Sequence, residues 1–246
     1  MCKQYKRVAE SREEGAAGPR AGPALAAMAT GKFITFEGGE GVGKSTQVQR
    51  LADRLRAGGR DVVLTREPGG SPFAEQVRGL ILDPATAPHS ALPEALLFYA
   101  ARSDLLDTII RPALAVGRWV ICDRFSDSTR VYQGVAGGVE PTMLDRLEDM
   151  IIGKTRPDLT VILDLAVDIG LARAASRRRA SPGVVMQPDA YEKRDPAFHV
   201  RLRAGYAAIA KAEPQRCVLV DGAKDADAIA AEIWAHVERR LTGSAG

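Results

Sequence analysis

FITFEGGEGVGKST, residues 33–46, joins an apolar run to a glycine-rich segment and then to helix-forming residues. Gly38 to Ser45 match the pattern G-x-x-x-x-G-K-[ST] of a phosphate-binding loop, the P-loop. Phosphate oxygens must come close to backbone N–H groups and a helix N-terminus in such a loop, and side chains at the glycine positions would block that approach. The stretch therefore predicts a buried strand, a nucleotide-binding loop and the start of a helix.

The side chains of this loop have separate expected roles in binding ATP and Mg²⁺. Lys44 is expected to place its ammonium group on the β- and γ-phosphates and to act in catalysis, and the Ser45 hydroxyl to hold Mg²⁺. Asp123, which ends a later apolar run, is a second candidate for the metal site, and Glu37 is a further one. The residues expected to bind ATP are Gly38, Gly39, Glu40, Gly41, Val42, Gly43, Lys44, Ser45 and Thr46.

Length and composition are those expected of one cytoplasmic α/β domain. The 246 residues can bury a full core, and 34 basic against 31 acidic residues leave a formal charge of +3, too small to argue for a nucleic-acid surface. The three cysteines are widely separated and show no metal-ligand spacing, which favours a reduced protein without disulfides. No run of about 18 apolar residues occurs. We therefore expect a cytoplasmic protein that binds neither nucleic acid nor membrane.

Apolar runs that alternate with helical patterns predict an α/β fold. A strand, helix, strand unit of the length seen after the P-loop implies a right-handed parallel crossover. We therefore expect the P-loop NTPase fold, with a five-stranded parallel sheet flanked by helices in three α/β/α layers. The strands expected after the P-loop strand span residues 61–65, 118–123, 159–164 and 216–220, and the expected helices span residues 46–58, 72–82, 93–117, 141–154, 168–179, 192–213 and 225–241.

Two segments fall outside this pattern. Residues 1–30 mix charge with Gly, Ala and Pro and show no apolar period, so they are expected to be a disordered extension. Met28 lies just before the first strand. Two further interpretations of this extension therefore stay open: translation could start upstream of Met28, or the extension could be a targeting segment. Residues 31–242 then form one domain. Within it, the basic tract Arg173–Arg179 runs into residues with loop chemistry, which predicts a mobile lid over about residues 174–191.

A P-loop alone does not choose among kinases, ATPases and GTPases. The guanine motif N/T-K-x-D is absent, and no acidic pair follows an apolar strand as it does in ATP-hydrolysing motors. Arginines lie instead near the expected carboxyl ends of strands, at Arg66 and Arg124, and on the long helix, at Arg102. Arginine forks suit phosphate oxygens. We therefore expect two phosphate sites that face each other.

Five segments are specific when they are taken together: FEGGEGVGKST (36–46), TREPGG (65–70), LFYAAR (97–102), DRF (123–125) and STRVYQG (128–134). Through them the chain from about Lys32 to Leu241 resembles bacterial thymidylate kinases, of the type in which the lid supplies a catalytic arginine. The resemblance implies that residues 31–242 are a nucleoside monophosphate kinase domain. It also implies transfer of the γ-phosphoryl group of ATP to dTMP, with dTDP as the product for dTTP biosynthesis.

The resemblance assigns substrate roles residue by residue. Glu40 is expected to meet the deoxyribose 3′-hydroxyl, and Arg66 and Arg124 to hold the acceptor phosphate, with Arg124 also catalytic. Phe98 would stack on thymine, although an apolar helix also favours core burial at that position. Tyr132 would crowd a ribose 2′-hydroxyl, although core packing is open to it as well. The other residues expected at the base are Arg102, which would donate to a thymine carbonyl, Ser128 and Gln133.

The resemblance leaves the catalytic arginine of the lid open. Arg173 and Arg177 are the two candidates. Many relatives continue with an Asp-Arg-aromatic-Glu run, but here Ala190 stands where an arginine is expected. Relatives also form homodimers through a helical face, for which the apolar region Pro93–Gly117 is the candidate, although burial within one subunit explains its apolar character equally well.

Two alternative functions stay open beside this one. Another nucleoside monophosphate or deoxynucleoside kinase would share the fold, but Phe98, Arg102 and Tyr132 favour thymine and deoxyribose. A switch-type P-loop protein would bind nucleotide and signal to a partner without catalysis. The missing guanine motif and the second set of arginines count against that class.

Overall fold

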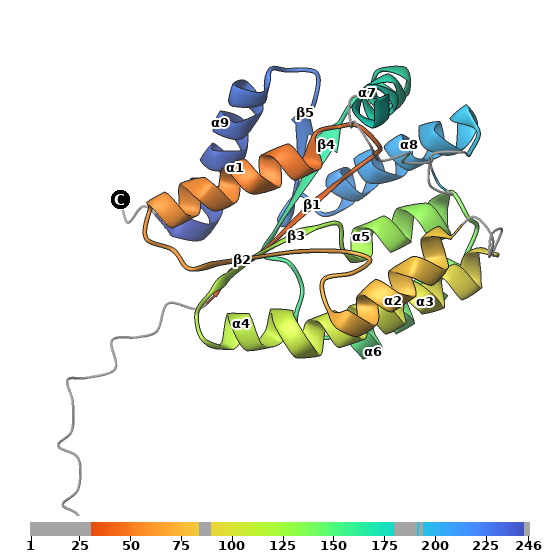
Figure 1. The fold of residues 1–246 in the computed structure, drawn as a ribbon, viewed down its shortest axis with the longest axis horizontal. Helices are drawn as coiled ribbons and strands as arrows, with labels where there is room; N and C mark the ends of the chain where they lie inside the picture. The colour runs from red at the N-terminus through yellow and green to blue at the C-terminus, as the bar shows by residue number, and fades with distance from the viewer. Residues whose placement is uncertain (1–30, 84–89, 180–190, 192–193, 244–246) are drawn as a thin grey trace, which may run out of the picture.

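A parallel sheet of five strands forms the centre of the molecule (Figure 1). Its strands are β1 (Phe33–Gly38), β2 (Val62–Arg66), β3 (Trp119–Asp123), β4 (Leu159–Asp164) and β5 (Cys217–Asp221). The computed structural model describes residues 31–83, 90–179, 191 and 194–243. The strands lie in the order β2-β3-β1-β4-β5, so the strand before the P-loop occupies the middle of the sheet. The expected P-loop NTPase fold is confirmed.

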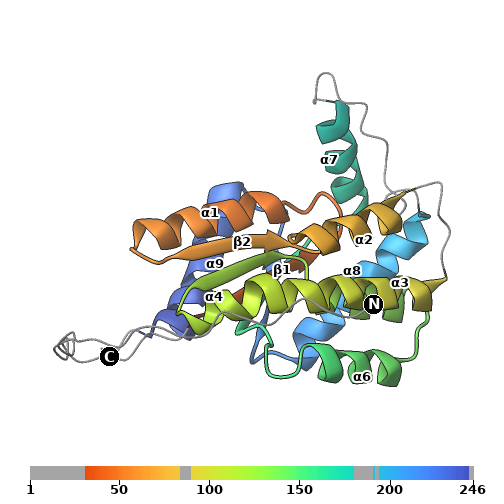
Figure 2. The same cartoon turned by 60° about the horizontal axis from the view of Figure 1, so that its bottom comes forward.

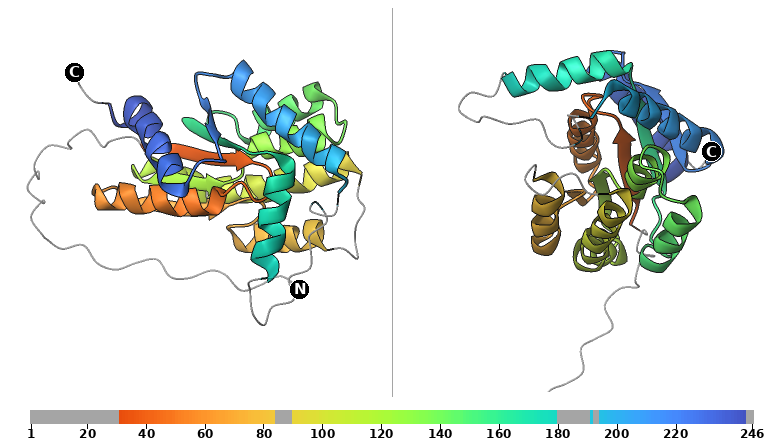
Figure 3. Two further views of the ribbon diagram at one scale, coloured as in Figure 1. Left: turned by 90° about the horizontal axis from the view of Figure 1, so that it is seen from above. Right: turned by 90° about the vertical axis from the view of Figure 1, so that its right-hand side faces the viewer.

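Helices cover both faces of the sheet, which explains why its central strands are buried on both sides (Figures 1 and 3). The helices are α1 (Lys44–Ala57), α2 (Pro72–Leu82), α3 (Ala91–Leu105), α4 (Arg111–Ala115), α5 (Ser126–Thr129), α6 (Pro141–Ile151), α7 (Val167–Arg179), α8 (Pro196–Ala212) and α9 (Ala226–Val237). On one face α1 and α9 share a core cluster with the sheet. On the other face α3, α4, α6 and α8 complete the core, and α2 packs against α3.

The helix expected over residues 93–117 is divided in three. A π-helical turn over Leu106–Ile110 separates α3 from α4, and α3 begins at Ala91, two residues earlier than expected. Leu96, one of the apolar residues of this segment, is 46% exposed. Its side chain lies on the outer face of α3, whereas Ala95 and Tyr99 pack into the core.

One helical segment has no counterpart in the expected elements. The helix α5 continues as a π-helical turn over Arg130–Val135, where the sequence shows no apolar stripe. All four residues of α5 are buried, but they are polar, so hydrophobic periodicity cannot reveal them. Buried carboxylates accept hydrogen bonds from the polar groups of this segment instead. Glu37 of β1, for example, accepts hydrogen bonds from the backbone N–H groups of Phe125 and Ser128.

The helix α7 stands away from the body of the molecule (Figures 2 and 3). It carries the basic tract, and the part of the expected lid over residues 180–190 lies outside the described residues. The expected disordered extension, residues 1–30, also lies outside them. Within the described part of the chain, no helix combines the length and the apolar character needed to span a membrane.

The pairing of the strands gathers their carboxyl ends at one edge of the sheet. Asp123 of β3 is paired with Phe36 of β1 on one side and with Arg66 of β2 on the other. Gly38 at the end of β1 is paired with Leu163 of β4. The segments that follow β1, β2, β3 and β4 therefore meet at this edge, which is where open α/β sheets bind ligands.

Candidate active site

The loop between β1 and α1 is shaped by glycines in the left-handed region of backbone conformation. Gly38, Gly41 and Gly43 have φ angles of 130°, 68° and 99°. A Cβ atom at Gly41 would lie 1.9 Å from the carbonyl oxygen of Gly170, and one at Gly38 would lie 2.4 Å from that of Leu163. Only glycine therefore fits these two positions. Gly43 also precedes the first turn of α1, so helix N–H groups face the loop and suit a phosphate.

Lys44 lies beneath the loop with its ammonium group held by the backbone. Its Nζ donates to the carbonyl oxygens of Gly38, at 3.1 Å, and Gly39, at 2.8 Å. Burial lowers the pKa of Lys44 to about 8, and the positive charge of Arg124 acts in the same direction, while neighbouring carboxylates oppose both. A phosphate chain at the loop would therefore restore the charge of a lysine that the free protein holds close to titration.

Ser45 and Asp123 form a pair of oxygen ligands beside the loop. The Ser45 hydroxyl donates to Oδ2 of Asp123 at 2.8 Å. Among the described residues, no group of three or more His, Cys, Asp or Glu side chains is arranged to enclose a metal ion. A hydroxyl and one carboxylate fit Mg²⁺, which usually takes one or two protein oxygens together with water and substrate phosphates.

Arg124 follows β3 and is the only non-glycine residue among those described with a positive φ, 71°. This backbone conformation is rare for a long side chain and turns the guanidinium group back over the P-loop. One arm, Nη1, donates to the Gly38 carbonyl at 3.1 Å and lies 3.3 Å from the hydroxyls of Ser128 and Tyr206. The other arm, Nη2, lies 2.6 Å from Oε1 of Glu40.

Glu40 projects from the P-loop toward α5 and the turn that follows it. Its Oε1 also accepts a hydrogen bond from the Tyr132 hydroxyl at 3.1 Å. Burial alone would raise the pKa of Glu40, but the charges of Arg124 and Lys44 outweigh it and hold the pKa at about 2. The carboxylate is therefore charged in the free protein and acts as an acceptor for hydroxyl groups as well as for arginine.

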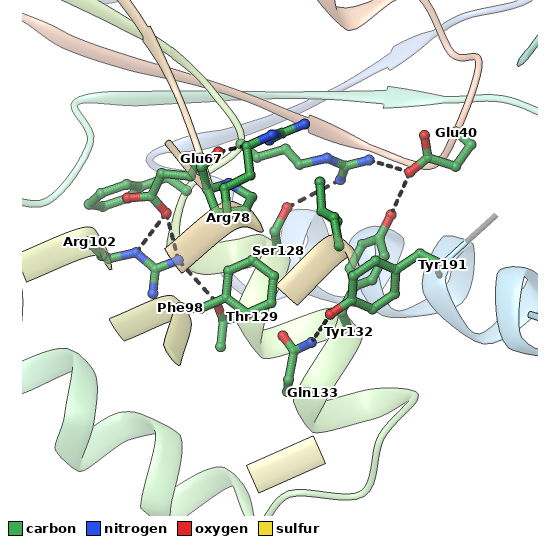
Figure 4. Close-up of a pocket in the computed structure, with 14 residues that line it drawn as sticks. Glu40, Glu67, Arg78, Phe98, Arg102, Ser128, Thr129, Tyr132, Gln133 and Tyr191 are labelled. Atoms are coloured by element: carbon green, nitrogen blue, oxygen red, sulfur yellow. Dashed lines mark hydrogen bonds and ion pairs between the residues drawn. The ribbon is translucent and has the colours of Figure 1, made fainter. Parts of the chain in front are cut away.

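A cavity of about 170 Å³ opens beside this carboxylate (Figure 4). It brings together seven of the eight residues expected to bind substrate. The eighth, Arg66, pairs with Glu75 of α2 and lines a neighbouring cleft that runs from the cavity to the P-loop. The seven that line the cavity are Glu40, Phe98, Arg102, Arg124, Ser128, Tyr132 and Gln133.

Arg102 is the most strongly buried cation of the cavity, at 1% exposure. Its Nε lies 2.9 Å from Oε2 of Glu67, and its Nη2 donates to the Thr129 hydroxyl at 3.0 Å. The guanidinium carbon lies 4.6 Å from the centre of the Tyr99 ring and 5.2 Å from that of Phe125. Its remaining nitrogen, Nη1, is buried without a hydrogen-bond partner among the described residues. A buried donor without a partner is costly, and a ligand carbonyl would satisfy it.

Four residues of the site were not expected from the sequence. Glu67 orients Arg102, Tyr191 lines the cavity, and Tyr206 of α8 reaches Arg124. Arg78 of α2 lines both the cavity and the cleft, and its Nη1 donates to the Pro68 carbonyl at 2.7 Å. Their positions depend on how distant helices pack on the sheet edge, which the spacing of residues does not encode.

A wider groove of about 670 Å³ lies on the other side of the P-loop, against α7. Thr46 and both candidate lid arginines line it. Arg173 donates to the carbonyl oxygen of Gly222 at 3.1 Å. Arg177 lines this groove and also the cleft beside the P-loop. The other expected ATP-binding residues of the loop that line the groove or the cleft are Glu40, Gly41, Val42, Gly43, Lys44 and Ser45.

Glu37, a candidate for metal contacts, is fully buried and faces the protein. Its Oε2 lies 2.6 Å from the Ser128 hydroxyl and 3.1 Å from that of Tyr206. Burial raises the pKa of Glu37 to about 7, and the nearby charge of Asp127 adds to this shift. The structure thus places Glu37 in the support beneath Arg124.

Comparisons with known proteins agree on one family. The sequence pattern of that family, described as "Thymidylate kinase", matches residues 36–233. The thymidylate kinase of Nitrobacter winogradskyi is 53% identical over 216 residues, which are 87% of this chain and 92% of the relative. That of Caulobacter vibrioides is 50% identical over 214 residues, 87% of this chain and 99% of the relative.

A solved structure gives the same result. The crystal structure of thymidylate kinase from Ehrlichia chaffeensis superposes with a TM-score of 0.67 at 34% sequence identity, over 85% of this chain and 99% of that one. The match therefore extends over the sheet, the P-loop and the cavity together. The chain belongs to the thymidylate kinase family.

Proposed function

We propose that the protein transfers the γ-phosphoryl group of ATP to the 5′-phosphate of dTMP and so produces dTDP for dTTP biosynthesis. One observation carries this proposal. The cavity and the P-loop cleft share Glu40, Glu67, Arg78 and Arg124, so an acceptor phosphate and a donor phosphate would meet at the same side chains. Family membership supports dTMP as the acceptor and ATP as the donor.

The acceptor assignments follow the geometry of the cavity. Arg124 is placed to hold the acceptor phosphate, and Glu40 to accept from the sugar 3′-hydroxyl. Phe98 offers a ring for the base, while the buried Nη1 of Arg102 supplies a donor for a thymine carbonyl. Tyr132 lies against the sugar side, since its hydroxyl contacts Glu40, and this ring would crowd a ribose 2′-hydroxyl.

The reaction then depends on positioning the two phosphates and neutralising their charge, and it does not require a general base. A phosphate monoester has a second pKa of about 6, so the acceptor is already a dianion near neutral pH. Lys44 and Arg124 would offset the repulsion between the two phosphates. We assign Mg²⁺ to Ser45 and Asp123, where it would neutralise phosphate charge when bound. Arg66, at the rim of the cleft, adds a second cation for the acceptor phosphate.

We assign the catalytic arginine of the lid to Arg177 rather than to Arg173. Arg177 lines the cleft between donor and acceptor as well as the donor groove. Arg173 lines the groove alone and is bound to the Gly222 carbonyl. A cation at the boundary of the two phosphate sites is the better placed to stabilise charge that develops in transfer.

We also propose a homodimer formed by α3 and α6. These helices pack against each other and carry four exposed apolar side chains, Leu92, Leu96, Met143 and Met150. Light scattering should give twice the mass of 26.3 kDa, and Leu96→Glu should shift the population toward the monomer. A cytoplasmic location is supported by Cys122 and Cys217, which are free thiols in the buried core.

An acceptor panel tests the proposed function. ADP release should be measured with ATP and Mg²⁺ and with dTMP, dUMP, the ribonucleotide of thymine, dCMP, dGMP or AMP as separate acceptors. We expect strong preference for dTMP. Equal use of several acceptors would leave the kinase fold in place but contradict the roles of Phe98, Arg102 and Tyr132. ADP release that does not depend on any acceptor would favour an ATPase or a switch.

A further inference from the structure

A buried hydrogen-bonded cluster lies along one wall of the cavity. It joins Gln133, from the turn after α5, to Glu94 of α3 and to Tyr191, and these side chains are 1%, 7% and 7% exposed. The Gln133 Nε2 lies 3.2 Å from Oε2 of Glu94 and 3.2 Å from the Tyr191 hydroxyl. The Tyr191 hydroxyl also donates to Oε2 of Glu94, at 3.0 Å.

The chemistry of the cluster fixes which end of the Gln133 carboxamide faces it. A carboxylate accepts hydrogen bonds and donates none, so Glu94 requires the NH₂ end of the amide. The hydroxyl hydrogen of Tyr191 points to Glu94, which leaves its oxygen as an acceptor for the Gln133 amide. Arg194 lies 3.7 Å from the other Glu94 oxygen and supports a negative charge there. The nitrogen of the Gln133 carboxamide therefore faces the cluster.

The carboxamide oxygen of Gln133 is the end left for the cavity. Figure 4 shows it on the side of the Phe98 ring, while the nitrogen turns to Tyr191. The cavity also holds Arg102, whose buried Nη1 is a donor without a partner among the described residues. One acceptor and one donor thus line the same cavity. Thymine and uracil carry the complementary pair, an N3–H donor next to an O4 acceptor, whereas cytosine carries the reverse pair.

We propose that Glu94, assisted by Tyr191, is a positioning residue for base selection: it locks the Gln133 carboxamide so that the pocket accepts imide bases and rejects cytosine. The assignment rests on the proposed function, since it takes the cavity as the acceptor-base pocket. Glu94 acts through Gln133 and need not touch the substrate. Replacing the carboxylate by an amide would allow either end of Gln133 to face the cavity, because an amide at position 94 can accept or donate.

The variant Glu94→Gln tests this assignment through a gain of activity. If both orientations of Gln133 become equally populated, kcat/KM for dTMP and for dUMP falls only about twofold, because half of the molecules stay competent. The same change removes one of the two mismatches with cytosine, the one at N3, while Arg102 still faces its amino group. We therefore expect kcat/KM for dCMP to rise about fivefold. The ratio of dTMP to dCMP use should fall at least tenfold, while the ratio of dTMP to dUMP stays constant. General damage to the fold would lower all three acceptors together.

Two further variants complete the experiment. Glu140→Gln, at an exposed glutamate before α6, is the matched control and should leave every ratio at the wild-type value. Gln133→Met keeps the question decidable if Glu94→Gln does not fold, and it should lower kcat/KM for dTMP about tenfold without lowering that for dCMP. A folded Glu94→Gln protein with a dTMP to dCMP ratio within twofold of wild type would overturn the proposal, as would an equal fall for both acceptors in Gln133→Met. Wild-type protein that uses neither dTMP nor dUMP would overturn the proposed function itself, together with the selection mechanism that depends on it.

Discussion

The two proposed nucleotide sites, on either side of the P-loop, are built in different ways. On the acceptor side, Arg102, Gln133 and Tyr132 are at most 8% exposed and each is held by other side chains. On the donor side, the phosphates would meet backbone N–H groups, and the groove is lined by arginines of α7, a helix that stands away from the body (Figure 2). Buried, interlocked side chains hold one geometry, whereas Arg173 and Arg177 of α7 are exposed.

The contrast separates two tasks. A rigid cavity whose polar groups need partners rejects the wrong base, because a mismatched base leaves those groups buried and unpaired. A groove built from backbone and exposed cations holds phosphate charge without reading the base. We therefore place the selection of substrate on the acceptor side and the completion of the transition state on the donor side. Four changes, from the largest expected effect to the smallest, test this division.

Arg124→Lys should have the largest effect, because it removes the fork that joins the two sites. A lysine loses the bidentate geometry, and the position has a φ of 71° that only close contacts maintain. We expect kcat/KM for dTMP to fall about 10³-fold, by analogy with the loss of one fixed donor to a reacting group. Steady-state kinetics at several dTMP concentrations measures it. A fall of kcat/KM of less than tenfold would show that the reaction does not depend on the two-armed guanidinium of Arg124.

Arg102→Met should destabilise the protein by about 3 kcal/mol, because it leaves the buried carboxylate of Glu67 without its partner. The double variant Glu67→Met/Arg102→Met should recover most of that stability, since two apolar side chains replace a buried ion pair. It should not recover dTMP binding. Urea unfolding and dTMP titration give the two quantities, and recovery of binding in the double variant would contradict the role of Arg102 at the base.

Arg177→Ala should act on phosphoryl transfer rather than on binding of the acceptor. We expect kcat to fall about 50-fold with KM for dTMP changed less than threefold, because the arginine is assigned to charge that develops during transfer. The matched control is Arg179→Ala, two residues further along α7, at an exposed arginine that contacts Ser176. An unchanged kcat in Arg177→Ala would contradict the assignment of Arg177 as the catalytic arginine. A larger fall of kcat in Arg173→Ala than in Arg177→Ala would assign that role to Arg173.

The smallest effect is a pH dependence of ATP binding. In the free protein burial lowers the pKa of Lys44 to about 8, and bound phosphates raise it again. Because the bound pKa is the higher one, affinity is complete below pH 8 and is lost above it. The Kd for ATP should rise about tenfold between pH 7 and pH 9. Lys44→Arg, which does not titrate in this range, should bind ATP with a flat profile, and an equally steep profile there would assign the titration to another group.

Much of the fold could be predicted from the sequence, because its elements have simple periodic patterns. The strand Leu159–Asp164 lies where its apolar run predicts it, and the P-loop glycines occupy positions where a Cβ would collide. The helix α5 could not be predicted in this way, since its buried residues are polar. Their partners, such as Glu37, come from a strand about ninety residues earlier.

The site residues likewise fall into those that the sequence could predict and those that it could not. A motif residue such as Lys44 is placed by a loop whose geometry the local sequence determines. The orientation of a side chain is different, because it depends on contacts between distant elements. Glu37 resembled a metal contact in the sequence, yet its carboxylate points inward to Ser128 and Tyr206. Gln133 was expected at the base, but only its pairing with Glu94 indicates which end of the amide faces the cavity.

The most direct test of the division between the sites is one pair of substrate panels on the wild-type protein. The first panel fixes ATP and varies the acceptor among dTMP, dUMP, dCMP and dGMP; the second fixes dTMP and varies the donor among ATP, dATP, GTP and CTP. The account predicts that kcat/KM spans at least a hundredfold wider range across acceptors than across donors. Donor selectivity equal to or greater than acceptor selectivity would contradict it.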